Sequence, residues 1–387
     1  MKIIADENMP ALDACFSSFG SIERVAGRTL SPEQLVDADV LLVRSITQVN
    51  QALLSKANTL KFVGTATIGT EHIDQNYLAS KDIHFHSAPG CNAIAVGEYV
   101  VTALLALATE QRRLLSQMSI AIVGGGNTGM QAARCCSALG MQVVVFDPPK
   151  HNAGFDSAPY PSADFNQVLA CDVISLHVPL TRSGDDPTYH LFDKMALQQL
   201  RSEQILINAC RGEVIDNYAL LELAQQSLHP NLILDVWEGE PEVLWPLVEY
   251  AQIASPHIAG YSFEGKLRGS LMLAEQLCKS LSLEANALPD IAQLAGPASI
   301  SKICLNLDAQ DELSAQDTLA RSCQSIYDIY LDDRYFRKQA QTVSGFDLLR
   351  KQYRQRREFS SCRIDLPPIA AQDHSFDLAR LGFQLGN

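Results

Sequence analysis

Three ionisable residues, Arg211, Glu240 and His257, stand shortly after apolar runs of the kind that form buried strands. Arg211 lies in NACRGE, Glu240 in DVWEGEP and His257 in SPHIAGY. A permanent cation at the end of a buried strand is unfavourable unless an anion meets it. That anion can be a structural carboxylate or the carboxylate of a substrate, and the residues alone leave both interpretations open.

The positions of the three residues point to a ligand site, because open α/β sheets bind ligands at the carboxyl ends of their strands. Each residue also has an ordinary structural explanation. Arg211 can close a salt bridge, Glu240 can be a solvated loop acid, and His257 can be a hydrogen-bonded loop histidine. Spacing does not prove that they converge.

A glycine fingerprint gives the sharpest local signal. In IAIVGGGNTGMQ, Gly124, Gly126 and Gly129 satisfy G-x-G-x-x-G between an expected strand and an expected helix, and Asp147 ends the next strand. The glycines allow a tight turn, a close backbone approach to a pyrophosphate and close helix packing. Amides from Asn127 onward then face the phosphates. Asp147 would hold the adenosine ribose and disfavour a 2′-phosphate, so NAD is expected rather than NADP.

The elements that must position these residues are short β-branched runs separated by helical stretches. This alternation predicts an α/β fold with two doubly wound parallel sheets, each covered by helices on both faces. The runs lie at residues 2 to 7, 39 to 45, 62 to 67, 119 to 125, 142 to 148, 172 to 179, 205 to 210 and 232 to 237.

Three domains are expected from the way these series are interrupted. A helical stretch from 91 to 115 separates the two series of runs, and another after residue 261 could carry the chain back to the first. The expected domains are a substrate-binding domain at 1–93 and 258–285, an NAD-binding domain at 94–257, and a small α+β domain at 286–387.

Composition narrows the function classes. The net charge of −14 argues against nucleic acid or an anionic membrane as the main partner, since both reward a basic surface. The ten cysteines form no CxxC pair and no Cys/His cluster at zinc spacing, so a reduced cytoplasmic protein without a metal is expected. The start of the chain lacks secretory signal features, and the apolar stretch 93 to 107 is too short to span a bilayer.

Taken together, the glycine fingerprint, NACRGE, DVWEGEP and PHIAG, in this order, resemble the D-2-hydroxyacid dehydrogenase family. In that family the matching arginine, glutamate and histidine are catalytic. The resemblance implies that His257 is the base, that Glu240 assists it, and that Arg211 binds the carboxylate of a small 2-hydroxy acid. It also implies NAD contacts at the following positions: Gly124, Gly126, Asn127, Thr128, Gly129, Asp147, Val178, Ala209, Cys210, Arg211, Asp235 and Gly260.

Further segments resemble one branch of the family, which acts on a phosphorylated 2-hydroxy acid. They include DENMP, VRSIT, VGTATIGTEHID, APGCNAIAVGEYV, HIAGY and EGK. This closer resemblance implies substrate contacts at Ser45, Thr67 and Tyr261. It also implies a homodimer formed through the C-terminal domain.

Several alternatives remain at this point. The chain could oxidise another D-2-hydroxy acid, or it could be a non-catalytic NAD-sensing protein on the same fold. Cys210 is interpreted as a packed position rather than a nucleophile, and Gly97, inside an expected helix, has no evident reason. The basic residues of the tail predict a solvated helix face, with reach to a partner subunit's phosphate site as the alternative: Arg350, Lys351, Arg354, Arg356 and Arg357.

Overall fold

The computed structural model of the chain describes residues 1–154, 157, 159–284, 288–307, 311–366 and 376–386. By internal contacts the chain divides into two compact units. The first unit consists of Met1–Asn92 and Ser262–Gly296, and the second unit of Ala93–Tyr261 and Pro297–Asn387. The boundary expected between residues 285 and 286 lies outside the described residues.

The first unit is built on a five-stranded parallel sheet of order β2-β1-β3-β4-β5. This is the flavodoxin-like doubly wound order. Its strands and α-helices are β1 (Lys2–Asp6), α1 (Leu12–Phe16), β2 (Ser21–Val25), β3 (Val40–Val43), β4 (Phe62–Thr65), α2 (Gln75–Ser80), β5 (His84–His86), α10 (Phe263–Leu281) and α11 (Ile291–Ala295).

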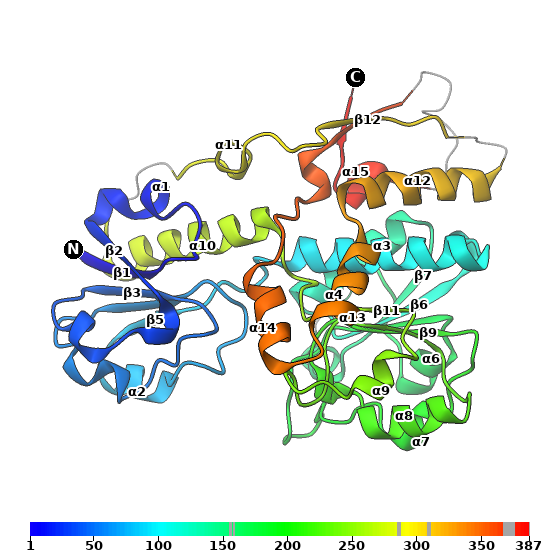
Figure 1. The fold of residues 1–387 in the computed structure, drawn as a ribbon, viewed down its shortest axis with the longest axis horizontal. Coiled ribbons are helices and arrows are strands. Elements are labelled where there is room, and N and C mark those ends of the chain that lie inside the picture. The colour runs from blue at the N-terminus through cyan, green and yellow to red at the C-terminus, as the bar shows by residue number, and fades with distance from the viewer. Residues whose placement is uncertain (155–156, 158, 285–287, 308–310, 367–375, 387) are drawn as a thin grey trace. The chain divides into compact units, whose positions relative to one another are not determined.

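One face of this sheet is closed by α10, which enters the first unit from much later in the chain (Figure 1). Leu273 and Leu277 of α10 pack in one apolar core with Ile3, Leu42 and Phe62 of the strands. The helix begins at Ser262, whose side chain accepts a hydrogen bond from the Gly265 amide and so caps its first turn. The amino end of α10 therefore lies by the carboxyl ends of β3 and β4, where Gly269 faces Ala66.

The second unit contains a six-stranded parallel sheet of order β11-β10-β9-β8-β6-β7. The strand order reverses between β6 and β8, which is where this class of sheet binds its ligand. Its strands and α-helices are α3 (Ala93–Gln111), β6 (Ser119–Val123), α4 (Asn127–Ala138), β7 (Gln142–Phe146), α5 (Pro148–Asn152), α6 (Phe165–Ala170), β8 (Val173–Leu176), α7 (Lys194–Leu197), β9 (Ile205–Asn208), α8 (Asn217–Gln225), β10 (Asn231–Leu234), α9 (Trp245–Val248) and β11 (Ile253–Ala254).

Residues 297–387, called the C-terminal segment below, complete the second unit. They include a three-stranded parallel sheet of order β12-β13-β14. Their elements are β12 (Lys302–Cys304), α12 (Glu312–Ile326), α13 (Ile329–Gln339), α14 (Val343–Lys351), β13 (Arg363–Asp365), α15 (Leu378–Leu381) and β14 (Gln384–Leu385). The predicted fold class, two doubly wound sheets with a small α+β addition, is confirmed.

Helix α3 is the central helix of the second unit. By length and composition it could cross a membrane, but 78% of its apolar window is buried inside the protein. It packs against α4 on one side and α12 on another, and Figure 1 shows α12 running beside it. The close approach to α4 gives the reason for Gly97: a Cβ there would lie 3.0 Å from Gln131 Cγ and 3.2 Å from Cys135 Sγ.

Candidate active site

The glycine fingerprint forms a tight turn at the point where the second sheet reverses its order. Gly124 follows β6 with φ of 100°, and a Cβ on it would lie 2.6 Å from the carbonyl oxygen of His177, which follows β8. A Cβ on Gly129 would lie only 1.8 Å from the Gly124 carbonyl oxygen. Side chains at these two positions would force apart the turn, the helix and the neighbouring strand loop.

The same turn is open where a dinucleotide phosphate must approach. A Cβ on Gly126 would meet no atom within 4 Å. Gly126 is also the N-cap of α4 and has no side chain to accept from the first amides of this helix, which begins with Asn127 and Thr128. Uncapped amides at the start of a 12-residue helix are suited to an anion.

Asp147 lies beside this turn, at the end of β7. Its Oδ2 accepts a hydrogen bond of 2.8 Å from the Gly125 amide, and its Oδ1 caps α5 by accepting from the Lys150 amide at 3.1 Å. The carboxylate is therefore fixed next to the phosphate-binding turn, in a position suited to ribose hydroxyls. These residues fit NAD.

Arg211 lies on the loop after β9, and this loop is folded back on itself. Asn208 Nδ2 donates to the Arg211 carbonyl at 2.9 Å, and Arg211 Nη1 donates to the Cys210 carbonyl at 2.8 Å. Gly212 then passes so close to the next loop that a Cβ would lie 2.0 Å from the carbonyl carbon of Trp237. The guanidinium-bearing loop is thus pressed against the loop that leads to Glu240.

Cys210, next to Arg211, is buried, and burial raises the pKa of its thiol to about 11. At neutral pH the side chain is therefore a thiol, which is a poor nucleophile. This agrees with its interpretation as a packed position.

His257 occupies a loop whose conformation is fixed by hydrogen bonds to Asp235. The histidine has φ of 58°, a left-handed backbone conformation that is unfavourable for a residue with a side chain. Its amide donates to the Asp235 carbonyl at 2.6 Å. The Asp235 carboxylate, 1% exposed, accepts from Ser255 Oγ at 2.6 Å and from the amides of Ile258 and Ala259 at 2.8 and 2.9 Å. Asp235 is thus the organiser of this loop, a role that its motif did not reveal.

Glu240 and His257 are in direct contact. Glu240 Oε1 is hydrogen-bonded to His257 Nδ1, and Glu240 Oε2 accepts from the Trp237 amide at 3.2 Å. Burial raises the pKa of Glu240, but His257 and, after it, Arg350 outweigh this effect, so the pKa lies below its ordinary value. The carboxylate is therefore charged, and the imidazole keeps Nε2 as the nitrogen that can exchange a proton.

The sheet places Arg211, Glu240 and His257 at one edge. Strands β9, β10 and β11 are consecutive neighbours, and Leu234 pairs with both Asn208 and Ala254. All three residues follow the carboxyl ends of these strands. Ala209 and Cys210 lie on the same β9 loop, Val178 follows β8, and Gly260 and Tyr261 follow His257.

The first unit carries Ser45 and Thr67, which follow the neighbouring strands β3 and β4. Ser45 is exposed, whereas Thr67 Oγ1 lies 2.7 Å from Thr65 Oγ1 and donates to the Gly69 carbonyl at 3.0 Å. Two cationic side chains, Arg44 after β3 and Lys266 in α10, belong to the same edge of the first sheet. Burial and the neighbouring Arg44 lower the pKa of Lys266, in α10, to about 8.

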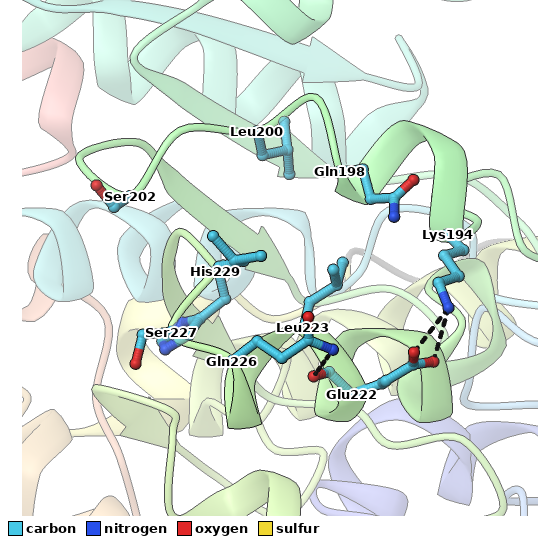
Figure 2. Close-up of a pocket in the computed structure, with 10 residues that line it drawn as sticks. Lys194, Gln198, Leu200, Ser202, Glu222, Leu223, Gln226, Ser227 and His229 are labelled. Atoms are coloured by element: carbon cyan, nitrogen blue, oxygen red, sulfur yellow. Dashed lines mark hydrogen bonds and ion pairs between the residues drawn. The ribbon is translucent and has the colours of Figure 1, made fainter.

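A cavity of about 300 Å³ elsewhere in the second unit is not part of this site (Figure 2). Its lining includes the Lys194–Glu222 ion pair, with Nζ–Oε distances of 2.8 Å. Ser202 and His229, also in the lining, precede β9 and β10, so the cavity lies at the amino ends of these strands. The loops of Arg211 and His257 are at the opposite ends.

Among the described residues, one group could bring metal ligands together: His190, Asp216 and Glu238 have ligand atoms within 4.8 Å of one another. In the structure His190 Nε2 lies 2.9 Å from Glu238 Oε1, and its Nδ1 lies 3.7 Å from Asp216 Oδ2. Each ring nitrogen faces a different carboxylate. This is the arrangement of a histidine bridging two acids.

The fold and these residues together define an NAD-dependent dehydrogenase of the doubly wound α/β class. Residues 102–259 match the family model of the D-isomer specific 2-hydroxyacid dehydrogenase, NAD binding domain. The erythronate-4-phosphate dehydrogenase of Tolumonas auensis is 48% identical over 386 residues, covering 100% of this chain and 99% of the relative. The enzyme of the same name from Shewanella amazonensis is 48% identical and covers 94% of this chain and 95% of the relative.

Solved structures share the fold. A D-lactate dehydrogenase from Aquifex aeolicus, complexed with NAD and lactic acid, has a TM-score of 0.58 at 23% identity, covering 73% of this chain and 96% of that one. An NAD-bound 3-phosphoglycerate dehydrogenase from Entamoeba histolytica has a TM-score of 0.61 at 20% identity, with coverages of 74% and 97%. The chain belongs to the D-isomer specific 2-hydroxyacid dehydrogenases and, among them, to the erythronate-4-phosphate dehydrogenase family. Its cofactor is NAD. Residues 302–382 match a domain of unknown function.

Proposed function

We propose that this protein oxidises 4-phospho-D-erythronate to 2-oxo-3-hydroxy-4-phosphobutanoate in the biosynthesis of pyridoxal 5′-phosphate. The near-complete coverage of relatives with the corresponding name supports the substrate. The observation that carries the reaction type is the Glu240–His257 hydrogen bond at the sheet edge that also carries Arg211.

In this proposal His257 is the general base. Oxidation of a 2-hydroxy acid removes the hydroxyl proton and a hydride from one carbon, so a base must face that hydroxyl. Glu240 occupies Nδ1 of the ring and leaves Nε2 to take the proton, and its negative charge stabilises the imidazolium that results. NAD, when bound, accepts the hydride.

Arg211 is proposed to bind the carboxylate of the substrate, next to the carbon that is oxidised. Its planar guanidinium can pair with the substrate carboxylate through two parallel hydrogen bonds, and it can stabilise the developing carbonyl oxygen. The folded β9 loop and the close approach of Gly212 to Trp237 fix the position of this arginine relative to the Glu240 loop.

The phosphate end of the substrate is assigned to the first unit. Ser45 and Thr67 offer hydroxyl groups at the ends of β3 and β4, and Arg44 and Lys266 offer positive charge. Tyr261 of the second unit is the remaining proposed substrate contact. Residues 1–93 and 258–285 are therefore proposed to form the substrate-binding domain, 94–257 the NAD-binding domain, and 286–387 a C-terminal domain.

The proposed NAD contacts follow the turn and the neighbouring loop ends. The pyrophosphate would meet the backbone around the α4 amino end, the ribose would meet Asp147, and Val178 would lie beside the adenine. The loops after β9, β10 and β11 complete the set. The full set is Gly124, Gly126, Asn127, Thr128, Gly129, Asp147, Val178, Ala209, Cys210, Arg211, Asp235 and Gly260.

A steady-state comparison tests the proposal. Purified protein is assayed for NADH formation, with and without 2-oxo acids as acceptors, on 4-phosphoerythronate, 3-phosphoglycerate, D-glycerate and D-lactate. We expect kcat/KM to be highest for 4-phosphoerythronate. Faster turnover of an unphosphorylated acid would overturn the substrate, and NAD binding without turnover of any acid would overturn the activity.

The protein is further proposed to be a cytoplasmic homodimer assembled through its C-terminal segment. Exposed apolar side chains on this segment support such an interface. They are Tyr335, Val343, Leu348 and Leu385. Light scattering after gel filtration measures the mass directly, and a monomer at micromolar concentration would contradict this part of the proposal.

A further inference from the structure

Arg350 of the C-terminal segment lies beside the proposed catalytic residues of the same chain. It belongs to α14, within the stretch that matches a domain of unknown function. The centre of its guanidinium lies 5.9 Å from the ring centroid of Tyr261 and 5.8 Å from that of Phe346, which is fully buried. This placement corrects the expectation of a solvated helix face, because Arg350 is partly buried and points into its own unit.

The other arginines of the basic run show that Arg350 is unusual. Arg354 forms an ion pair of 3.2 Å with Asp332, and the fully buried Arg356 forms one of 3.6 Å with Glu98. Arg350, in contrast, has no carboxylate within ion-pairing distance in the described part of the chain, and its buried Nε has no hydrogen-bond partner there. A buried cation that forms no ion pair is unfavourable unless its charge stabilises a nearby group.

Arg350 acts on Tyr261, in the loop of residues 257–261 that carries His257, and on the acids Glu240 and Asp235. Burial lowers the pKa of the Arg350 guanidinium, but Tyr261, Glu240 and Asp235 outweigh burial and raise it. Reciprocally, Arg350 is one of the groups that keep Glu240 charged. A second arginine holds the backbone of the loop, since Arg356 Nη1 donates to the Ala259 carbonyl at 3.1 Å.

We propose that the C-terminal segment is part of the catalytic apparatus of its own chain and that Arg350 is a positioning residue for the Glu240–His257 pair. The inference rests on the proposed roles of these two residues but not on the identity of the 2-hydroxy acid. Arg350 packs on Tyr261 through its guanidinium and places a fixed positive charge by Glu240. In this proposal the residues that match a domain of unknown function contribute to proton transfer by His257.

The charge of Arg350 has a definite effect on the base. Glu240 stabilises the imidazolium that forms when His257 accepts a proton, and a cation beside Glu240 weakens this stabilisation. In the described part of the chain, the titratable groups whose charges act on Arg350 include Tyr261, Glu240 and Asp235, and Tyr261 itself packs edge-on against Tyr353. Removing the arginine charge would therefore move the protonation of His257 to higher pH.

The test compares three full-length variants. Arg350→Met keeps most of the aliphatic stem and removes the charge, Arg350→Lys keeps the charge, and Lys351→Met removes a charge from the exposed neighbouring residue of α14. kcat/KM for oxidation is measured against pH. For Arg350→Met we expect the acidic limb to move to higher pH by about half a unit, which lowers kcat/KM on that limb by about threefold.

A second measurement does not depend on turnover. The nine histidines are labelled with 13C, the His257 signal is assigned by its loss in His257→Asn, and its titration is followed by NMR. We expect the midpoint to rise in Arg350→Met and to stay near the parent value in Arg350→Lys and Lys351→Met. An unchanged midpoint in a folded Arg350→Met protein, or an equal rise in the Lys351→Met control, would overturn the inference. Failure to oxidise any 2-hydroxy acid would overturn the proposed function instead.

Discussion

At the residue scale, the site depends on what each charged side chain finds around it. Glu240 is buried enough for its charge to be unfavourable, yet His257 and Arg350 keep its pKa below the ordinary value. Lys266 shows the opposite balance, because burial and Arg44 favour its neutral form. For both side chains the direction in which the pKa departs from its ordinary value is known. The direction in which pH changes the rate of oxidation and the KM for substrate can therefore be predicted.

Replacing Glu240 by glutamine should lower the rate of oxidation and move the acidic limb of the pH profile to lower pH. The amide retains the size of the carboxylate but no longer stabilises the imidazolium, so His257 loses its proton more readily and is a weaker base. We expect kcat to fall by about 10- to 100-fold. Initial rates between pH 5 and 9 measure both effects, and a limb shifted to higher pH would contradict the assigned role.

Lys266 should give the binding of a phosphorylated substrate a basic limit. With a pKa of about 8, its ammonium is charged below that pH and loses its charge above it, so the KM for 4-phosphoerythronate should rise as pH passes through about 8. Lys266→Met should raise this KM at pH 7 and remove the rise. Titration with NAD serves as the control, since its affinity should change little. Equal KM values for the variant and the parent protein would exclude the phosphate role.

At the element scale, the second sheet uses its strands to bring loop residues together and its glycines to let those loops meet. Gly124, Gly129 and Gly212 are each pressed against another backbone segment, whereas Gly126 faces open space. The fingerprint thus contains glycines required for packing and a glycine available for a ligand.

This difference predicts two distinct phenotypes for alanine substitutions. Gly129→Ala should be strongly destabilising, because a Cβ would lie 1.8 Å from the Gly124 carbonyl oxygen and the helix would have to move. Gly126→Ala should fold with nearly the parent melting temperature but bind NAD at least about 10-fold more weakly, because the methyl group would occupy the approach of the pyrophosphate. Thermal unfolding and NAD titration distinguish the two. Normal NAD affinity in Gly126→Ala would place the pyrophosphate elsewhere.

The sequence predicted the strands that are formed by apolar, β-branched runs, including the edge strand β7, and missed short strands that lack such a run. The apolar runs expected as strands correspond to β1, β3, β4 and β6 to β10. Strands β2 and β5 were missed because they lie at the two edges of the first sheet, where a strand pairs on one side only and SIERV and HFH need no continuous apolar run.

For the site, the sequence indicated residue types and strand ends but not long-range partners. The motifs pointed to Glu240 and His257, which the structure places in contact. Nothing local indicated that Asp235 would hold the histidine loop, or that Arg350 would arrive about a hundred residues later in the chain to face Tyr261. A run of basic residues predicts a solvent-exposed helix face, and only the tertiary contacts of the folded chain show that one of these arginines is partly buried.

At the scale of the whole molecule, the C-terminal segment shares a core with the sheet that carries the site. Tyr327, Phe359 and Ile364 belong to the same apolar cluster as Leu104, in α3, and Ile122, in β6. A buried ion pair crosses this cluster, since Arg356, 1% exposed, pairs with Glu98, 0% exposed, and also donates to the Ala95 carbonyl at 2.7 Å. The segment is thus integral to the second unit.

The Glu98–Arg356 pair should show strong coupling in a double-mutant cycle. Arg356→Met leaves a buried carboxylate without its cation and should cost about 3–5 kcal/mol of unfolding free energy. Glu98→Gln in the same chain removes that unpaired charge, so the double variant should be more stable than the sum of the two single losses predicts. Denaturant unfolding measures the three values. Additive losses would mean that the pair is not energetically coupled.

Both units are discontinuous in the chain, and this has a consequence for synthesis. The first unit begins with residue 1, but α10, which supplies Leu273 and Leu277 to its core, emerges only after all strands of the second sheet. The second unit in turn waits for the C-terminal segment to cover α3. Neither unit can reach its final state as a nascent N-terminal fragment, so chains stalled on the ribosome before α10 should expose the uncovered face of the first sheet and recruit chaperones.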